Sequence, residues 1–314
     1  MKRDEQGLQN VRVLASGLEF PEGPMVLADG SVAFCEIRGG RVRKVSPDGR
    51  VSVVAETGGG PNGMAIGPDG AYYVCNNGGN VYRPDHFVAQ GPSPTYQGGS
   101  LQRIDPASGR FENLYTHCGE HRLSSPNDIV FDRHGGFYFT DMGKKHGRTR
   151  DNGALYYAMP DGSRITELAG GLLAPNGVGL SPEEDELYFS ETETGRLIAM
   201  RVLAPGQLER LPFPAPSGGR FVCGPADFHR FDSLAVQANG DICVGTLMTG
   251  RITVSRPDGT IVREPRMPGD IYPTNICFGG PGMKTAFITL SETGRLIAAD
   301  WPEPGLVLNF AATS

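Results

Sequence analysis

The chain has 314 residues, and its 45 glycines and 25 prolines are nearly twice the average usage of these two residue types. Hydrophobic residues make up 39% of the sequence and the net charge is only -6, which excludes a disordered chain. No apolar run is long enough for a membrane-spanning helix, which excludes one. The lack of a long basic run argues against a nucleic-acid partner, and the lack of a Cys-x-x-Cys pair argues against a zinc knuckle.

One pattern recurs six times along the chain, and each copy reads as two β-strands joined by a turn. A proline or an apolar residue comes first, followed by Asn, Asp or Glu and an apolar run; a turn then leads into a second apolar run. Short runs bounded by Gly, Pro, Asn and Asp are typical of antiparallel hairpins. In chain order the copies span residues 21–35, 61–75, 126–140, 175–190, 231–245 and 273–290.

Two further strands complete each unit. A tight turn that contains glycine precedes a third strand, as in Gly40-Arg41-Val42, and a fourth strand often follows a Pro-Asp-Gly turn. Six copies give about 52 residues per unit, a plausible length for a four-stranded propeller blade. The sequence therefore predicts an all-β, six-bladed β-propeller that forms a single domain over residues 1–314.

The segments outside the repeats predict how the ring closes and what covers it. Residues 10–18 look like a lone strand that pairs with the last blade and hides the sheet edges, although residues 306–310 compete for that position. Long loops at 82–98, 144–153 and 205–228 are expected to decide the substrate, and the first and last of them to cover the channel mouth.

One polar position recurs in every copy. The innermost strand of each blade runs along the channel, so this position is expected to form a ring of oxygen-bearing side chains there. Carboxylate and amide oxygens suit Ca²⁺, whereas no His or Cys is present to favour zinc. Asparagines in such turns can instead cap their own backbone, but a buried glutamate needs a partner or a metal. The six residues are Glu22, Asn62, Asn127, Asn176, Asp232 and Asn275.

The strings around these positions carry a family resemblance. Phe20-Pro21-Glu22-Gly23-Pro24, with Pro126-Asn127-Asp128, Pro175-Asn176-Gly177 and Asp232-Ser233-Leu234, resembles the gluconolactonase, senescence-marker-protein and luciferin-regenerating family. The resemblance spans about residues 10–302 and implies a six-bladed propeller with a divalent metal, usually calcium, at the channel centre. It implies Glu22, Asn127, Asn176 and Asp232 as the metal ligands. Ser233 is a departure, because the family usually has Gly at that position.

Together, the residues and the resemblance predict a metal-dependent lactonase that opens a small lactone, of a sugar or another acid, to the hydroxy acid. The metal, most suitably Ca²⁺, would polarise the carbonyl, and Asp232 would deprotonate the attacking water or attack directly. Asn62, Asp141 and Asn275 are the expected substrate contacts. Phosphotriester hydrolysis at the same centre and a non-catalytic binding propeller are the alternatives.

The expected partners and location follow from what the sequence lacks. The start of the chain has no apolar core, and most cysteines lie in apolar runs as free buried thiols do, so we expect a cytoplasmic protein. Its partner is expected to be a small-molecule lactone, with neither nucleic acid nor membrane, and the oligomeric state is left open.

Overall fold

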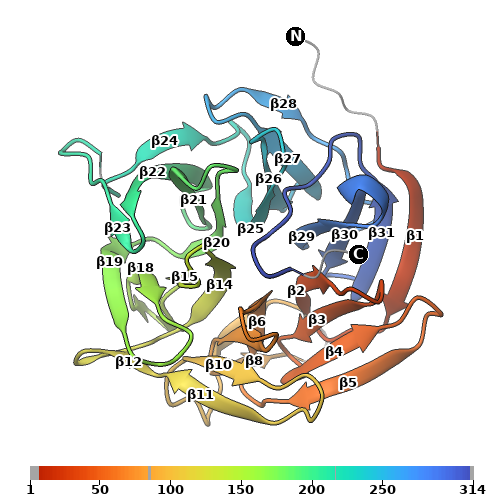
Figure 1. The fold of residues 1–314 in the computed structure, drawn as a ribbon, viewed down its shortest axis with the longest axis horizontal. Coiled ribbons are helices and arrows are strands. Elements are labelled where there is room, and N and C mark those ends of the chain that lie inside the picture. Colours follow the sequence, from red (N-terminus) through yellow and green to blue (C-terminus); the bar gives the residue numbers. More distant parts are fainter. Residues whose placement is uncertain (1–6, 84–85, 216, 312–314) are drawn as a thin grey trace.

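Six antiparallel sheets stand around a common axis in this computed structural model, which describes residues 7–83, 86–215 and 217–311 (Figure 1). The predicted six-bladed, all-β propeller is confirmed. The first blade contains β2 (Pro21–Val26), β3 (Val32–Glu36), β4 (Arg41–Val45) and β5 (Val51–Glu56). The second contains β6 (Pro61–Ile66), β7 (Tyr72–Asn76), β10 (Ser100–Ile104) and β11 (Phe111–Tyr115), and the third β14 (Pro126–Phe131), β15 (Phe137–Asp141), β18 (Gly153–Ala158) and β19 (Ile165–Leu172).

The remaining blades follow in chain order. The fourth contains β20 (Pro175–Leu180), β21 (Glu186–Glu191) and β22 (Arg196–Ala204), on which β23 (Gln207–Leu208) and β24 (Arg220–Cys223) both pair. The fifth contains β25 (Arg230–Val236), β26 (Ile242–Leu247), β27 (Arg251–Ser255) and β28 (Ile261–Arg263). The sixth contains β29 (Pro273–Gly279), β30 (Thr285–Leu290), β31 (Arg295–Asp300) and β1 (Gln9–Ser16).

Short elements lie between the blades. Three two-stranded hairpins pair β8 (Asn80–Tyr82) with β9 (Ala89–Pro92), β12 (His117–Cys118) with β13 (His121–Arg122), and β16 (Lys145–His146) with β17 (Thr149–Arg150). A 3-10 turn, η1 (Pro281–Met283), is the one helical element in the described ranges. Within those ranges, no helix is long and apolar enough to cross a membrane.

The ring closes through the N-terminal strand, as the sequence predicts. β1 pairs antiparallel with β31, so the outermost strand of the last blade comes from the start of the chain. This pairing ties the two ends of the propeller together and covers the edge of β31. Six buried apolar clusters lie between neighbouring blades, one at each junction, and they form the core.

The inner strands contact one another around the axis in the order β2, β6, β14, β20, β25 and β29. In each of them, the pairing with the second strand of the same blade shifts in register near the polar position predicted from the repeats. Such a shift releases a residue from the regular ladder and changes the direction of its side chain. The repeat therefore places one polar residue per blade close to the axis.

In three blades the residue directly after the polar position is glycine: Gly23, Gly63 and Gly177. At these points the neighbouring inner strand comes very close. A Cβ at Gly23 would collide with the carbonyl oxygen of Asn62 on β6. A Cβ at Gly177 would lie 2.7 Å from the Cα atom of Ser233 on β25, closer than two non-bonded carbon atoms approach. These glycines are required because the neighbouring backbone occupies the space of a side chain.

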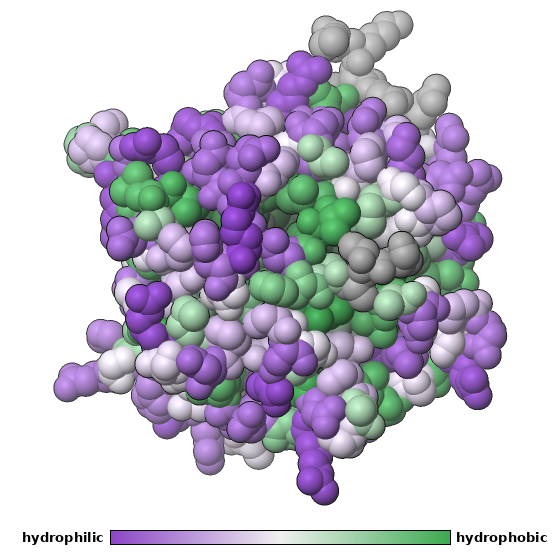
Figure 2. Space-filling view, in the orientation of Figure 1, coloured by the Kyte–Doolittle hydropathy of each residue, from purple (hydrophilic) through white to green (hydrophobic). Residues whose placement is uncertain are grey.

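A C-terminal strap, residues 305–311, does not form the closing strand but crosses one end of the axis (Figure 1). The amide N–H of Leu306 donates to the carbonyl of Val236, and Asn309 reaches the far side of the ring. The strap covers an apolar cavity of about 120 Å³ between the downstream ends of the inner strands. Figure 2 shows hydrophobic surface near the centre of this face.

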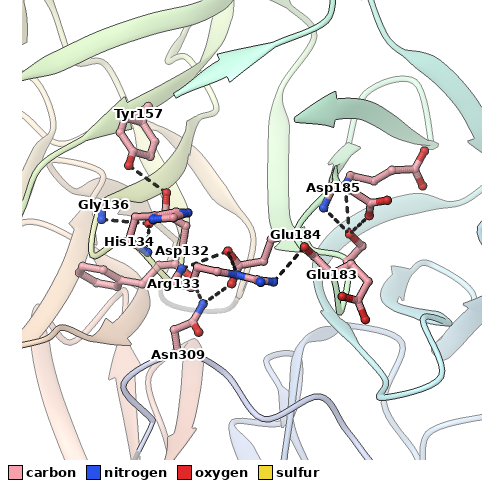
Figure 3. A network of polar contacts seen from close by, with 12 residues as sticks. Asp132, Arg133, His134, Gly136, Tyr157, Glu183, Glu184, Asp185 and Asn309 are labelled. Atoms are coloured by element: carbon pink, nitrogen blue, oxygen red, sulfur yellow. Dashed lines mark hydrogen bonds and ion pairs between the residues drawn. The ribbon is translucent and has the colours of Figure 1, made fainter. Parts of the chain in front are cut away.

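Asn309 joins the strap to the third and fourth blades (Figure 3). Its side-chain amide donates to the carbonyl of Phe131 over 3.1 Å and to Oε1 of Glu184 over 2.6 Å. Glu184, in the turn between β20 and β21, also pairs with Arg133, in the turn between β14 and β15, over 3.0 Å. The Glu184 side chain thus connects the third blade, the fourth blade and the strap.

We expect Asn309→Ala to lower the free energy of unfolding by about 1–2 kcal/mol, because it leaves a carbonyl and a carboxylate short of a donor. Urea denaturation would measure the change. Val307→Ala is the matched control on the same strap, since Val307 is 51% exposed, and its effect should stay within about 0.5 kcal/mol. Equal effects of the two variants would show that the Asn309 bonds do not hold the strap.

Candidate functional site

The upstream ends of the inner strands open into a cavity of about 450 Å³, which we call the mouth cavity. It lies at the opposite end of the axis from the strap, because the inner strands all run away from it. Five of the six predicted polar residues line it, each from a different blade: Glu22, Asn62, Asn127, Asn176 and Asp232. The structure thus brings together all four residues expected to bind metal.

Glu22 and Asp232 place two buried carboxyl groups in the mouth cavity. The Oε2 atom of Glu22 accepts hydrogen bonds from the Gly23 N–H over 2.8 Å and from Asn275 Nδ2 over 2.9 Å. Burial raises the pKa of Glu22 well above its ordinary value, and the charge of Asp232 raises it further. Burial also raises the pKa of Asp232 to about 7. Among the described residues neither carboxyl group has a cationic partner, so no described side chain stabilises their ionised forms by charge.

Two amide oxygens add to this set. Oδ1 of Asn62 and Oδ1 of Asn127 are buried, and neither accepts a hydrogen bond from a described residue. The amide nitrogen of Asn127 lies 3.7 Å from Sδ of Met142, which leaves the oxygen on the other side free. Burying a carbonyl oxygen without a hydrogen-bond donor costs free energy, so such an oxygen in a folded protein calls for a partner. Amide and carboxylate oxygens are the ligands that a divalent cation such as Ca²⁺ prefers, and the mouth cavity holds two of each. The residues present therefore fit a calcium ion.

Asn176 is arranged differently from the other asparagines. Its Oδ1 atom accepts from the Ser233 hydroxyl over 3.2 Å, and its Nδ2 atom donates to Thr192 Oγ1 over 3.1 Å. An amide oxygen has two lone pairs, so Oδ1 keeps one of them for a cation beside its bond to Ser233. Ser233 also interacts with the carboxyl group of Asp128.

Asn275, one of the three expected substrate contacts, lies behind Glu22. It lines the apolar cavity under the strap and is absent from the lining of the mouth cavity. Its Nδ2 atom donates to Glu22, and its Oδ1 atom accepts from the Ile276 N–H over 2.8 Å. The structure therefore gives Asn275 a positioning role toward Glu22, whereas Asn62 does line the mouth cavity.

Asp141, another expected substrate contact, also lies outside the lining of the mouth cavity. Its carboxylate accepts from the backbone N–H groups of Ser124, Ser125 and Gly143 over 2.7, 2.7 and 2.9 Å. These bonds hold the chain that enters β14.

The same support recurs at the equivalent position of three other blades. Glu36, Asn76 and Glu191 each end a second strand opposite the proline that begins the inner strand, as Asp141 does. Each accepts a backbone N–H from the segment just before that proline. This recurrence identifies Asp141 as a structural acceptor that orients the inner strand.

A second ring of lining residues escaped the sequence analysis. In four blades the residue that follows the second strand lines the mouth cavity: Ile37, Asn77, Met142 and Thr192. The second strand is antiparallel to the inner strand, so its end lies beside the start of the inner strand. The repeats could have predicted this second ring, because the four residues occupy equivalent positions directly after the second strand of their blades.

The walls of the mouth cavity come from two of the three long loops. Tyr82 and residues 88–91 of the β8–β9 hairpin line it, and so do Lys145 and Arg150 of the β16–β17 hairpin. The expectation that the 205–228 loop covers the mouth is wrong: β23 and β24 pair with β22, and none of its described residues lines the mouth cavity. That loop extends the outer edge of the fourth blade.

Lys144 is buried in the wall of the mouth cavity. Its Nζ atom donates to the carbonyl oxygens of Asn77 and Gly79 over 2.7 and 3.0 Å, and lies 4.7 Å from the centre of the Tyr96 ring. Burial lowers the pKa of Lys144 to about 8, and the charge of Asp141 opposes this effect. The ammonium group therefore holds the segment that leads into the β8–β9 hairpin.

Comparison with known proteins agrees with this architecture. Residues 20–292 match the family model described as the SMP-30/Gluconolactonase/LRE-like region. The chain belongs to the SMP-30/gluconolactonase family. The resemblance expected from the sequence is thereby confirmed, and it covers all six inner strands.

Individual relatives within the family are distant. A gluconolactonase of Zymomonas mobilis is 26% identical over 204 residues, covering 58% of this chain and 52% of the relative, so the match spans about half of that protein. Lactonase drp35 of Staphylococcus haemolyticus is 28% identical over 263 residues, covering 82% and 73%. Among solved structures, a calcium-binding protein, regucalcin, of Agrobacterium tumefaciens superposes with a TM-score of 0.70 at 17% identity, covering 96% and 99% of the two chains. At that identity the superposition shows the shared fold.

We expect Lys144→Met to change how stability depends on pH. Native Lys144 releases its proton near pH 8, whereas a lysine of the unfolded chain holds it to about pH 10.4, so the unfolded state binds more protons in between. The stability of the unmodified protein should therefore rise with pH relative to the variant, by about 1.4 kcal/mol per pH unit at most.

Urea denaturation at pH 7.5, 8.5 and 9.5 would measure this difference. Lys145→Met is the matched control, since Lys145 is exposed and should give no such slope. A Lys144→Met protein whose stability stays parallel to that of the unmodified protein would contradict the lowered pKa of Lys144.

Proposed function

We propose that this protein is a calcium-dependent lactonase that hydrolyses a small lactone to its hydroxy acid. One observation carries the proposal: two buried carboxyl groups without a cationic partner and two buried amide oxygens without donors line the same mouth cavity. Relatives named gluconolactonase and lactonase, and a calcium-binding protein of the same fold, support the substrate class and the metal.

The metal would be held by Glu22, Asn127, Asn176 and Asp232, with the free oxygen of Asn62 beside them. When bound, a divalent cation neutralises the two carboxylates and acts as a Lewis acid toward a carbonyl oxygen. Asn275 keeps Oε2 of Glu22 in place through its 2.9 Å hydrogen bond, which leaves Oε1 for another partner. The strap and the apolar cavity beneath it close the other end of the axis, so the substrate enters from the mouth.

Asp232 is our candidate for the group that moves the proton. Its carboxylate would take a proton from the water that attacks the lactone carbonyl carbon. The ring C–O bond then breaks, and the proton returns from Asp232 to the departing ring oxygen. The lactone and one water together give one hydroxy acid, so the atoms balance. Direct attack by Asp232 is the other route, and ¹⁸O from labelled water would enter the protein only in that case.

We expect Asp232→Asn to lower kcat for a lactone by about 10²-fold or more, because the amide cannot accept the proton. The hydrolysis of glucono-1,5-lactone can be followed by acid release, with a fluorophosphate assayed in parallel for the alternative activity. Asp258→Asn is the control in the same blade, since Asp258 caps an exposed turn through the Thr260 N–H. Unchanged turnover in Asp232→Asn with a normal melting temperature would exclude Asp232 as the base.

We expect one calcium ion to bind per chain, and its removal to lower the melting temperature. A ligand bound only by the folded state raises stability, and here it also cancels the repulsion between Glu22 and Asp232. Thermal unfolding with a chelator and with added calcium would measure the shift. Asn127→Ala should need at least tenfold more calcium for the same shift, whereas Asn239→Ala, in an exposed turn, should not. A melting temperature that ignores calcium would contradict the metal site.

A further inference from the structure

A cluster of charged residues lies at one side of the mouth cavity, and we call it the rim cluster. Lys145, Arg150 and Arg230 line the cavity. Glu193 joins the two arginines, since its Oε1 atom lies 2.8 Å from Arg150 Nη1 and its Oε2 atom 3.1 Å from Arg230 Nη2. The members come from the β16–β17 hairpin, the turn after β21 and the start of β25, so three consecutive blades contribute to one rim.

The rim cluster carries an excess of positive charge. Burial alone would raise the pKa of Glu193, but Arg150, Arg230 and Lys145 together hold it below its ordinary value, so Glu193 is ionised at neutral pH. Three cations then face one carboxylate. Lys145 has no ion-pair partner among the described residues, and the Nε atom of Arg150 is buried with no described hydrogen-bond partner. Some N–H groups of the rim cluster therefore have no hydrogen-bond acceptor among the described residues.

The opposite charges of the cavity do not offset this excess. Glu22 and Asp232 lie deeper, and the divalent cation of the proposed function would cancel their charge. Lys144 adds a further positive charge in the wall. A cleft lined by one sign of charge concentrates its field on whatever enters. With calcium bound, the mouth cavity is thus positive along one side.

Tyr272 adds an uncharged hydrogen-bond donor to the lining of the mouth cavity. Its side chain lines the cavity, and its phenol is affected by both Asp232 and Arg230. Burial, followed by the charge of Asp232, raises the pKa of Tyr272 to about 12, so its hydroxyl stays protonated and can donate a hydrogen bond. A donor in this place suits an oxygen-rich ligand that reaches from the floor to the rim.

We propose that the substrate is a lactone that also carries an anionic group, a carboxylate or a phosphate, which the rim cluster binds while the lactone carbonyl faces Glu22 and Asp232. This inference rests on the proposed lactonase function and narrows its substrate class. A neutral lactone would gain little from three cations at the mouth, whereas an anionic one would be attracted to them and oriented by the paired N–H groups of arginine.

The calcium-loaded protein should be tested with three lactones: neutral glucono-1,5-lactone, the carboxylate-bearing glucaro-1,4-lactone and 6-phosphoglucono-1,5-lactone. We expect kcat/KM to be at least tenfold higher for one of the anionic lactones, and this advantage to shrink as salt rises from 0.02 to 0.5 M. The anionic lactone that is preferred identifies the group as carboxylate or phosphate.

Two variants assign the preference to the rim cluster. Arg230→Gln should lower the ratio of anionic to neutral kcat/KM by at least tenfold, mainly through KM. Lys145→Gln should lower the same ratio by at least threefold, and it keeps the test open if Arg230→Gln fails to fold, because Lys145 is exposed. Arg201→Gln is the control: Arg201 pairs with Glu209 on the outer surface of the fourth blade, and its loss should leave the ratio unchanged.

Failure of the inference and failure of the proposed function give different results. If the neutral lactone is hydrolysed as well as both anionic ones, or if the variants leave the ratio unchanged, the inference is wrong and the rim cluster merely ties three blades together. If no lactone is hydrolysed, the proposed function fails. Binding then decides: glucarate should raise the melting temperature more than uncharged glucitol and less so in Lys145→Gln, and no such difference would overturn the inference.

Discussion

The structure depends on the close approach of six inner strands around one axis. Each strand touches two neighbours, so the residue at a given position of every strand must fit a space that the next backbone already limits. Gly23 and Gly177 meet this constraint by lacking a Cβ atom. The same approach makes one polar residue per blade converge, and it gives the two ends of the axis different characters: apolar beneath the strap and polar at the mouth.

Charge is distributed with depth in the mouth cavity. The floor holds two carboxyl groups whose burial is costly without a cation, and the rim holds three cations around Glu193. A divalent ion at the floor would turn the cavity from a balance of opposite charges into a positively charged pocket. Metal binding and substrate attraction would therefore depend on each other through the same field, because the rim acts on an anion fully only when the floor is neutral.

The residues that end the second strands of four blades hold the mouth cavity rigid. Glu36, Asn76, Asp141 and Glu191 bind the backbone just before the inner strands, and Lys144 binds the segment before the β8–β9 hairpin. These groups are buried and hydrogen-bonded to the backbone, so they orient the lining residues while leaving them free to bind a ligand. Ligand-binding side chains held in this way lose little conformational freedom on binding.

The repeat was enough to predict the propeller, its closure by the N-terminal strand and the convergence of Glu22, Asn62, Asn127, Asn176 and Asp232, because each follows from a fixed position in a repeated unit. The roles of Asp141 and Asn275 were harder to predict. Both have side chains able to bind a substrate, but in the folded chain Asp141 accepts hydrogen bonds from the backbone before β14, and Asn275 donates to Glu22 of the neighbouring blade. Residue type predicts the ability to bind, whereas the partner depends on the neighbours.

Tertiary structure alone decided which face each loop covers and which charges meet. The 205–228 loop carries the composition of a covering loop, yet it pairs with the outer edge of β22, where an unpaired strand edge was available. Lys145, Arg150, Glu193 and Arg230 are separated by up to 85 positions and share no motif; they form one rim because three blades bring them to the same side of the axis. The sequence by itself determined the repeated strands and the ring of oxygen-bearing side chains, since periodicity encodes both, while the packing of the blades determined the rim.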